Sequence, residues 1–166
     1  SRPQAVDRTL TTLRFLRDIP QGPQATGKGG HKGFYYHFLD MQNGHRYDSW
    51  VELSSVDTAL LMMGVLFAQA YYEGEDPREQ EIRQIADQIY RRVDWTWLQV
   101  RDPLVSMGWF PESGFITYDW MGYNEAMMMY ILALGSPTHP VDADAWTVWT
   151  RTYNDDWGVY YGQEYL

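Results

Sequence analysis

The chain has 166 residues, no cysteine and a formal net charge of −9, and 16% of its residues are aromatic. This length is typical of one domain, so we expect residues 1–166 to form a single unit. The acidic balance argues against nucleic acid and anionic membranes as partners, because both bind basic faces. The lack of cysteine excludes disulfides, thiolate nucleophiles and cysteine-based zinc sites.

The N-terminal sequence has no apolar segment of the kind that a signal peptide carries. The longest apolar run, residues 59–68, is half as long as the roughly 20 residues that a membrane-spanning helix needs. We therefore expect a soluble chain. Its start at Ser1 rather than at Met suggests a piece of a longer polypeptide.

The first predicted element is a helix over residues 4–18, whose apolar residues recur at helical spacing on one face. Residues 19–33 are rich in glycine and proline and predict a loop. Residues 34–50 predict two short extended segments around an Asn43-Gly44 turn.

The second predicted helix covers residues 55–72, where Ser54 and Asp57 resemble a capping box. It is apolar on almost every side, which predicts burial on every side. A third helix begins at Asp76-Pro77, with Asp as N-cap and Pro in the first helical position. Its isoleucines form one face and its charged residues the other, so we expect it at a surface.

Residues 96–123 predict an irregular, aromatic segment. Asn124 then caps a fourth helix, again apolar all round, which Gly135 closes in the C′ position. Asp142 opens a fifth helix with an aromatic stripe on one side. Residues 154–166 show no convincing element.

The predicted helices alternate in character: the first, third and fifth are one-sided, and the second and fourth are apolar all round. Two concentric shells of helices produce this alternation, which favours an all-α fold of the α/α-barrel type. A plain antiparallel bundle is the alternative, and it predicts one-sided stripes on all helices.

Three carboxylates lie near the starts of the two apolar helices: Glu52, Asp57 and Glu125. If both helices point their N-termini to one end of a barrel, these groups converge there among the aromatic residues of the preceding segments. Paired carboxylates beside aromatic surfaces suit cleavage of a glycosidic bond, because one group protonates the leaving oxygen and the other activates water or attacks the sugar.

Each carboxylate also has a purely structural interpretation. Asp57 can cap a helix, Glu125 suits the positive end of a helix dipole, and Asp119, a further candidate, can be a turn residue. A helix N-terminus lowers the pKa of a carboxyl group whereas a general acid needs a raised pKa. Burial among aromatic side chains would have to outweigh the dipole.

The histidines offer a weaker signal. His31, His37 and His45 share one loop region and could bind a metal, but none has the i, i+4 helical spacing of a zinc-protease motif. His37 lies in the aromatic run FYYHF and could instead contact a substrate. We expect neither a metal nor another cofactor.

Four segments resemble the glycoamylase-like family, which includes bacterial endo-β-1,2-glucanases and a related domain of cyclic β-1,2-glucan synthases. In family order they are HKGFYYHFLDM, ELSSVDTALLMMG, MGWFPESGF and GYNEAMMMYILALGSPTHP, and they span roughly residues 31–140.

The resemblance implies part of an (α/α)6 barrel, with short β-hairpins in the loops at the helix N-terminal end, that acts on β-glucans, with β-1,2-glucan as the best guess. The catalytic acid would fall on the Glu of GYNEAM, Glu125, with Asp57 in the same pocket and Glu52 nearby. Sugar subsites would be lined by the aromatic residues Tyr36, Trp109, Trp120 and Tyr123.

The family fold continues for about as long again, and five helices cannot close a barrel of six hairpins. We therefore expect an incomplete, half-barrel domain that exposes a large apolar patch. Its partners would be an oligosaccharide or polysaccharide substrate and the missing half-barrel or another copy of the chain. Full activity is not expected from these residues alone.

We expect a glycoside hydrolase, with inversion favoured over retention. The alternatives are a non-catalytic glycan-binding or structural module and a transglycosylase of glucan cyclisation. The resemblance implies a periplasmic or secreted protein. Linkage, chain-length preference and oligomeric state are not decided by these patterns.

Overall fold

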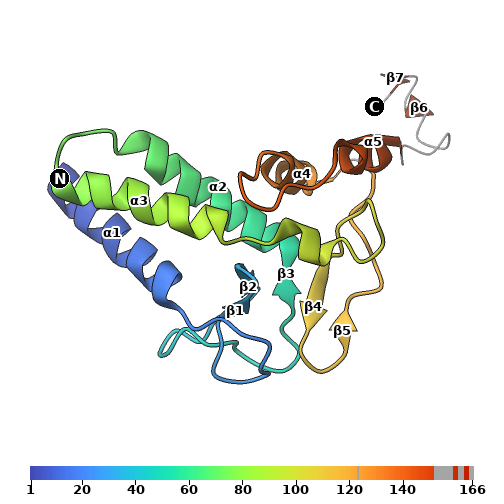
Figure 1. Ribbon diagram of the computed structural model, residues 1–166, viewed down its shortest axis with the longest axis horizontal. Coiled ribbons are helices and arrows are strands. Elements are labelled where there is room, and N and C mark those ends of the chain that lie inside the picture. Colours follow the sequence, from blue (N-terminus) through green and yellow to red (C-terminus); the bar gives the residue numbers. More distant parts are fainter. Residues whose placement is uncertain (123, 152–158, 161–162, 165–166) are drawn as a thin grey trace.

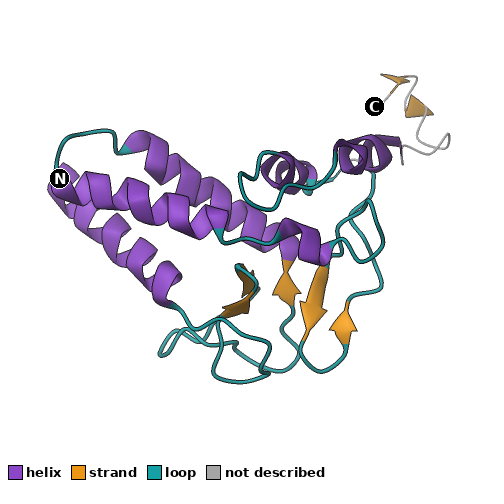
Figure 2. Ribbon diagram, viewed as in Figure 1, coloured by secondary structure: helices purple, strands orange, loops and turns teal. Residues whose placement is uncertain are grey.

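The computed structural model describes residues 1–122, 124–151, 159–160 and 163–164. Three long helices lie side by side: α1 (Arg2–Asp18), α2 (Ser55–Tyr71) and α3 (Pro77–Arg91) (Figure 1). Two shorter ones, α4 (Met127–Leu134) and α5 (Ala143–Arg151), lie beyond the start of α2, and the strands gather at the same end of the molecule (Figure 2). The chain is therefore helix-rich with a small antiparallel sheet.

The α3 helix packs against both α1 and α2, and its start follows the predicted signals. The Asp76 carboxylate accepts a hydrogen bond from the backbone N–H of Arg78, and Pro77 occupies the first helical position. Its isoleucines Ile82, Ile85 and Ile89 are fully buried. The one-sided pattern of this helix is confirmed.

The five-stranded sheet is antiparallel throughout and follows chain order. Its strands are β1 (Gly30–His31), β2 (Phe34–Tyr36), β3 (Leu53–Ser54), β4 (Gly108–Phe110) and β5 (Gly114–Phe115). A short 3-10 helix, η1 (Trp95–Leu98), precedes β4. Strand β3 ends at Ser54 and α2 begins at Ser55. Side chains on β3 and at the adjacent end of β2 therefore lie next to the N-terminus of α2.

The predicted pair of extended segments in residues 34–50 is only partly present. The β2 strand pairs with β1 and β3, and the second segment contributes just an isolated bridge from Leu39 to Arg46. The turn itself forms, with Gly44 at φ +73°. The structure differs from the prediction because Arg46 turns inward, and its guanidinium binds backbone carbonyls instead of leaving residues 46–50 free to form a strand.

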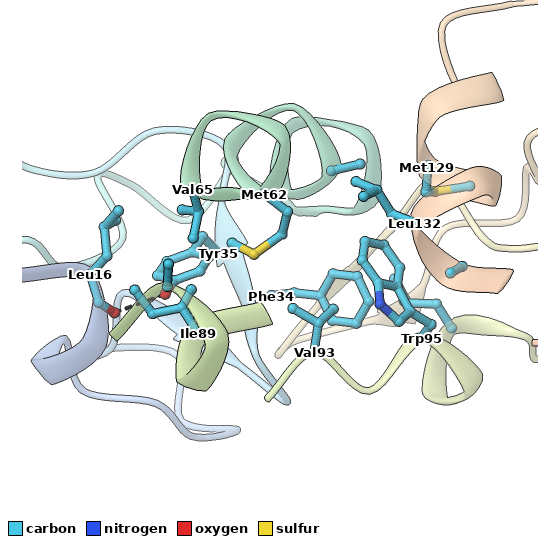
Figure 3. Close-up of a cluster of buried hydrophobic side chains, with 14 of the residues drawn as sticks. Leu16, Phe34, Tyr35, Met62, Val65, Ile89, Val93, Trp95, Met129 and Leu132 are labelled. Carbon is cyan, nitrogen blue, oxygen red and sulfur yellow. Dashed lines mark hydrogen bonds between the residues drawn. The ribbon is translucent and has the colours of Figure 1, made fainter. Parts of the chain in front are cut away.

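The core runs without interruption from the three-helix layer to α4. Figure 3 shows Val65 and Met62 of α2 next to Tyr35, and Trp95 next to Leu132 and Met129 of α4. The Tyr35 hydroxyl donates a 2.8 Å hydrogen bond to the carbonyl of Leu16, which ties the sheet to the end of α1. Burial of these large side chains supplies most of the drive to fold.

The prediction that the second and fourth helices are buried on every side is wrong for the described chain. On α2, Leu60, Phe67 and Tyr71 are 49%, 69% and 53% exposed, and on α4 Ile131 is 46% exposed. The described residues form a helical layer with an open face and do not enclose α2. The closed barrel therefore remains a prediction.

Helix α4 also differs from its predicted ends. It begins at Met127, with Ala126 in the N-cap position, so Asn124 and Glu125 lie in the preceding turn. Asn124 uses its side-chain oxygen to accept from the N–H of Ala126 and so ends the turn rather than capping the helix. Gly135 has φ −80°, a right-handed conformation and not the left-handed C′ geometry.

Near the C-terminus, β6 (Val159–Tyr160) pairs with β7 (Gln163–Glu164). This pairing lies where the pattern predicted no element. Among the described helices, none combines the length and the apolar character needed to cross a membrane.

Candidate active site

The junction of β3 and α2 positions two of the predicted carboxylates. Ser54 is the N-cap of α2, and its Oγ accepts a hydrogen bond from the Asp57 N–H at 3.2 Å. The same hydroxyl donates to Asp57 Oδ2 at 2.5 Å. Asp57 therefore takes part in the cap, as its structural interpretation predicted, while its second carboxylate oxygen is left for other contacts.

His37 joins Glu52 and Asp57 into one group. Its Nδ1 lies 2.7 Å from Glu52 Oε1, and its Nε2 lies 3.6 Å from Asp57 Oδ2, which is too long for a hydrogen bond. These three side chains, from the ends of β2 and β3 and the first turn of α2, form what we call the carboxylate cluster. They are 25% to 37% exposed, so a ligand can reach them from solvent.

The cluster is rich in negative charge. Within the described residues, neither Glu52 nor Asp57 forms an ion pair with lysine or arginine. One ligand atom from each of His37, Glu52 and Asp57 lies within 4.8 Å of the others, and this donor set could hold a divalent cation. The expected absence of a metal stays a prediction.

Two predicted sugar-binding aromatics do not join the carboxylate cluster, although Tyr36 lines a cavity of about 250 Å³ together with His37 and Asp57. Tyr36 and Trp109 both pair with Leu53 in the sheet, and strand alternation places their side chains on the face opposite Glu52. Tyr36 is 3% exposed. Trp109 packs with its ring centroid 5.3 Å from that of His31. Both side chains serve the core on that face of the sheet.

Trp120, by contrast, lies at the N-terminus of α2. Its indole Nε1–H donates a 2.8 Å hydrogen bond to Ser55 Oγ, and its carbonyl accepts from the Tyr130 hydroxyl at 2.9 Å. The indole thus contacts the residue that directly follows the Ser54 cap. Trp120 therefore approaches the end of α2 at which the carboxylate cluster lies.

Glu125 is exposed in the turn before α4, and no contact joins it to the carboxylate cluster within the described interactions. Tyr123 lies outside the described residues. Asp119 forms a bidentate pair with Arg101, at 2.7 and 2.6 Å, which raises the pKa of that guanidinium. Asp119 therefore has a structural role, but as the partner of Arg101 and in a bridge with Ser106 rather than in a turn.

The three loop histidines do not come together as a metal site. His31 packs between Trp97 and Trp109, and burial lowers its pKa. His45 lies in the turn, where its backbone N–H donates to Asn43 Oδ1. Of these three histidines, only His37 belongs to the carboxylate cluster, because it alone directly follows the β2 strand.

Sequence reasoning missed Arg46. Its side chain is 2% exposed, and it donates to the carbonyls of Val51 and Ser49 and to Glu112. Aromatic residues of the segments before the apolar helices were expected near the carboxylates, but Phe38, Tyr47 and Trp50, whose exposed rings follow one another next to His37, were not named as site residues. Spacing offers no signal for these four, because an irregular loop places them.

Comparison with known proteins connects this geometry to a family. Residues 117–166 match the Glycoamylase family model. Over 95% of its length the chain is 30% identical to an exo-β-1,2-glucooligosaccharide sophorohydrolase (non-reducing end) of Parabacteroides distasonis. A β-1,2-glucanase structure from the same species superposes on 99% of the chain with a TM-score of 0.81 and 24% identity.

A second solved structure, the endo-β-1,2-glucanase of Chitinophaga pinensis in complex with sophorotriose and glucose, gives a TM-score of 0.83 at 23% identity over 99% of the chain. The chain spans 23% of the sophorohydrolase, 26% of the P. distasonis glucanase structure and 38% of the C. pinensis one. The resemblance to the glycoamylase-like family that the four motifs predicted is confirmed, and the chain corresponds to a fraction of such proteins.

Proposed function

We propose that the polypeptide carrying this chain is a glycoside hydrolase of β-glucans, with β-1,2-glucan as its substrate. The carboxylate cluster at the N-terminus of α2 carries the proposal, because it presents two acidic groups and an imidazole to solvent at one point. The names of the similar proteins supply the substrate class.

The chemistry needs one acid and one base or nucleophile. In the proposed reaction Glu125 donates its proton to the glycosidic oxygen as the bond from that oxygen to the anomeric carbon breaks. A water molecule attacks the anomeric carbon and gives its proton to a carboxylate of the cluster. The products are two shorter sugars, and the proton gained by the base restores Glu125 through solvent.

The spacing within the cluster bears on stereochemistry. Oxygens of Glu52 and Asp57 lie within 4.8 Å of one another, whereas the two carboxyl groups of an inverting enzyme are about 6.5–9.5 Å apart. Glu52 and Asp57 therefore do not form an inverting pair with each other. We propose inversion with Glu125 as the acid and one of these two as the base.

The chain spans only a fraction of the length of its relatives, and this favours a narrower role for the isolated chain than for the whole protein. We propose that the 166 residues bind glucan, and that further polypeptide, as the remaining half-barrel or as another copy of the chain, completes the catalytic cleft. A periplasmic or secreted location is part of the same proposal.

The test is hydrolysis of β-1,2-glucan by the longest natural polypeptide that carries this chain. At least one of Asp57→Asn and Glu52→Gln, the one that removes the base, should lower kcat at least about a hundredfold. Asp87→Asn is the matched control, because Asp87 is an exposed carboxylate paired with Arg91 on α3. Equal rates for all three variants would contradict the proposal.

Product analysis in the same assay separates the alternatives. The anomer released first distinguishes inversion from retention. Cyclic or transferred glucans in place of new reducing ends would identify a transglycosylase. Binding without turnover, even in the longest polypeptide, would identify a glycan-binding module.

A further inference from the structure

Three exposed aromatic residues lie together beside the carboxylate cluster, and neither the motifs nor the comparisons assign them a role. Phe38, Tyr47 and Trp50, which we call the aromatic platform, are 48%, 61% and 59% exposed. The ring centroid of Trp50 is 6.0 Å from that of Phe38 and 6.3 Å from that of Tyr47. Large exposed aromatic groups of this kind mark binding surfaces.

The platform is continuous with the cluster. The His37 ring stacks on Phe38 with a centroid distance of 4.3 Å and an interplanar angle of 10°, and the same imidazole contacts Glu52. A chain molecule held at the carboxylates can therefore extend over Phe38 to Trp50 and Tyr47 without leaving the surface.

The loop that carries the platform is held in place. Buried Arg46 donates to the carbonyls of Ser49 and Val51, the Tyr47 N–H donates to the Phe38 carbonyl at 3.0 Å, and the Val51 N–H donates to the Asp48 carbonyl at 3.1 Å. The backbone N–H and hydroxyl of Ser49, with the Trp50 side chain, lower the pKa of Asp48. Rings fixed in this way lose little freedom when a ligand binds.

Polar groups flank the rings. A cavity of about 380 Å³ borders Tyr47, and its lining includes the polar side chains Asp40, Asn43, His45 and Asp48. A sugar ring has apolar faces and hydroxyl edges, so it matches flat aromatic faces with hydrogen-bonding groups beside them.

We propose that the aromatic platform is a subsite for the sugar units of a β-glucan chain that flank the unit held at the carboxylate cluster. The class of ligand rests on the proposed function, but the platform is tested by binding rather than by turnover. It should give longer oligosaccharides an affinity advantage that a disaccharide lacks.

The experiment is calorimetric titration of residues 1–166, and of the longest natural polypeptide that carries them, with β-1,2-linked glucose disaccharide and pentasaccharide. Trp50→Ala and Phe38→Ala should weaken pentasaccharide binding about tenfold and change disaccharide binding little. Trp50→Phe should retain most of the affinity. In residues 1–166, Phe67→Ala is the matched control, because Phe67 is also an exposed aromatic residue but lies on α2 and stacks on Tyr71.

Circular dichroism and urea unfolding establish that each variant is folded, and Phe38→Ala carries the test if Trp50→Ala is not folded. Unchanged affinity in both alanine variants, an equal loss in Phe67→Ala, or no saturable binding to either polypeptide would overturn the platform. Self-association that Trp50→Ala abolishes, without glucan binding, would assign the surface to a protein contact and overturn it too.

The same variants distinguish this proposal from the proposed function. Binding that depends on the aromatic platform, without hydrolysis, would support the subsite proposal and contradict the proposed hydrolase function. Hydrolysis with an unchanged KM for long glucans in Trp50→Ala removes the platform and leaves the hydrolase.

Discussion

At the scale of single residues, the Tyr130 hydroxyl joins two segments that border the site. It accepts from the Val105 N–H at 3.0 Å and donates to the Trp120 carbonyl at 2.9 Å. Burial raises the pKa of Tyr130 to about 12, so the phenol stays protonated and keeps both bonds at ordinary pH. The position of Trp120 at the start of α2 depends on this hydroxyl.

Tyr130→Phe should therefore lower the free energy of unfolding by about 1–3 kcal/mol, because it leaves a buried N–H and a buried carbonyl without their partner. Urea denaturation monitored by tryptophan fluorescence measures the change. Tyr118→Phe provides the control, since Tyr118 is 70% exposed and should be neutral. A loss of the same size in both variants would contradict this role for Tyr130.

Residue-scale prediction from sequence succeeded where a residue type and a nearby element limit the options. Asp57 and Glu52 lie on either side of Ser54, which marks the start of α2 as its N-cap, and the structure brings the two carboxylates together. Tyr36 and Trp109 were predicted to line sugar subsites beside them because the family resemblance implied it. Strand pairing decides which face a side chain takes, and the sequence does not reveal the register of strands two or three residues long.

At the scale of elements, a pair of acidic residues on α3 connects it to α1. Glu79 is buried, accepts two hydrogen bonds from the Arg2 guanidinium at 3.1 and 3.0 Å, and accepts a third from the Gly74 N–H at 2.9 Å. The Arg2 hydrogen bonds, followed by that of Gly74, lower the pKa of Glu79. Glu81 forms a similar but more exposed pair with Arg14.

A carboxyl group whose pKa is lowered by folding stabilises the native state above its unfolded pKa, and that contribution is lost as the pH falls through its folded pKa. Glu79→Gln should therefore destabilise the protein at pH 7, and the difference from wild type should shrink as the pH falls below about 4.3, the ordinary pKa of glutamate. Urea unfolding between pH 7 and pH 3 measures this.

Glu81→Gln is the control for that series. Its ion pair is solvent-screened, so the substitution should have a smaller effect at every pH. A constant difference between Glu79→Gln and wild type across the whole pH range would show that lost packing, not charge, is responsible.

Element-scale predictions were most accurate where helix caps are strong. Asp76 and Pro77 start α3 as predicted, and Ser54 caps α2. The prediction that residues 1–166 bury α2 on every side was wrong. A helix that is apolar all round indicates that polypeptide covers every side of it, but not that residues 1–166 supply all of that polypeptide. Exposed Leu60 and Phe67 show the uncovered side.

At the scale of the whole molecule, the exposed side of α2 agrees with the comparisons, in which the chain spans only a fraction of its relatives. A groove of about 600 Å³ runs between α1 and α2, lined largely by apolar residues such as Leu13, Leu61 and Phe67. The exposed apolar patch that the resemblance implied is thus present on α2. We propose that further polypeptide covers it, as part of the completed domain.

Phe67→Gln should reduce concentration-dependent self-association of residues 1–166, because it removes the most exposed ring of this face. It should change the free energy of unfolding by less than about 0.5 kcal/mol, as surface substitutions do. Sedimentation velocity over a concentration series measures association, with Val100→Gln as the control on a different exposed apolar residue. Unfolding of Phe67→Gln would show instead that the ring belongs to the core.

We propose that Glu125 and the carboxylate cluster together hydrolyse a β-glucan. It is tested most directly by the rate at which new reducing ends form from β-1,2-glucan, with wild type and Glu125→Gln in the longest natural polypeptide that carries this chain. Wild type should release reducing ends rapidly, whereas Glu125→Gln should lose almost all of this rate and still bind glucan. A wild-type rate in Glu125→Gln would contradict the proposal.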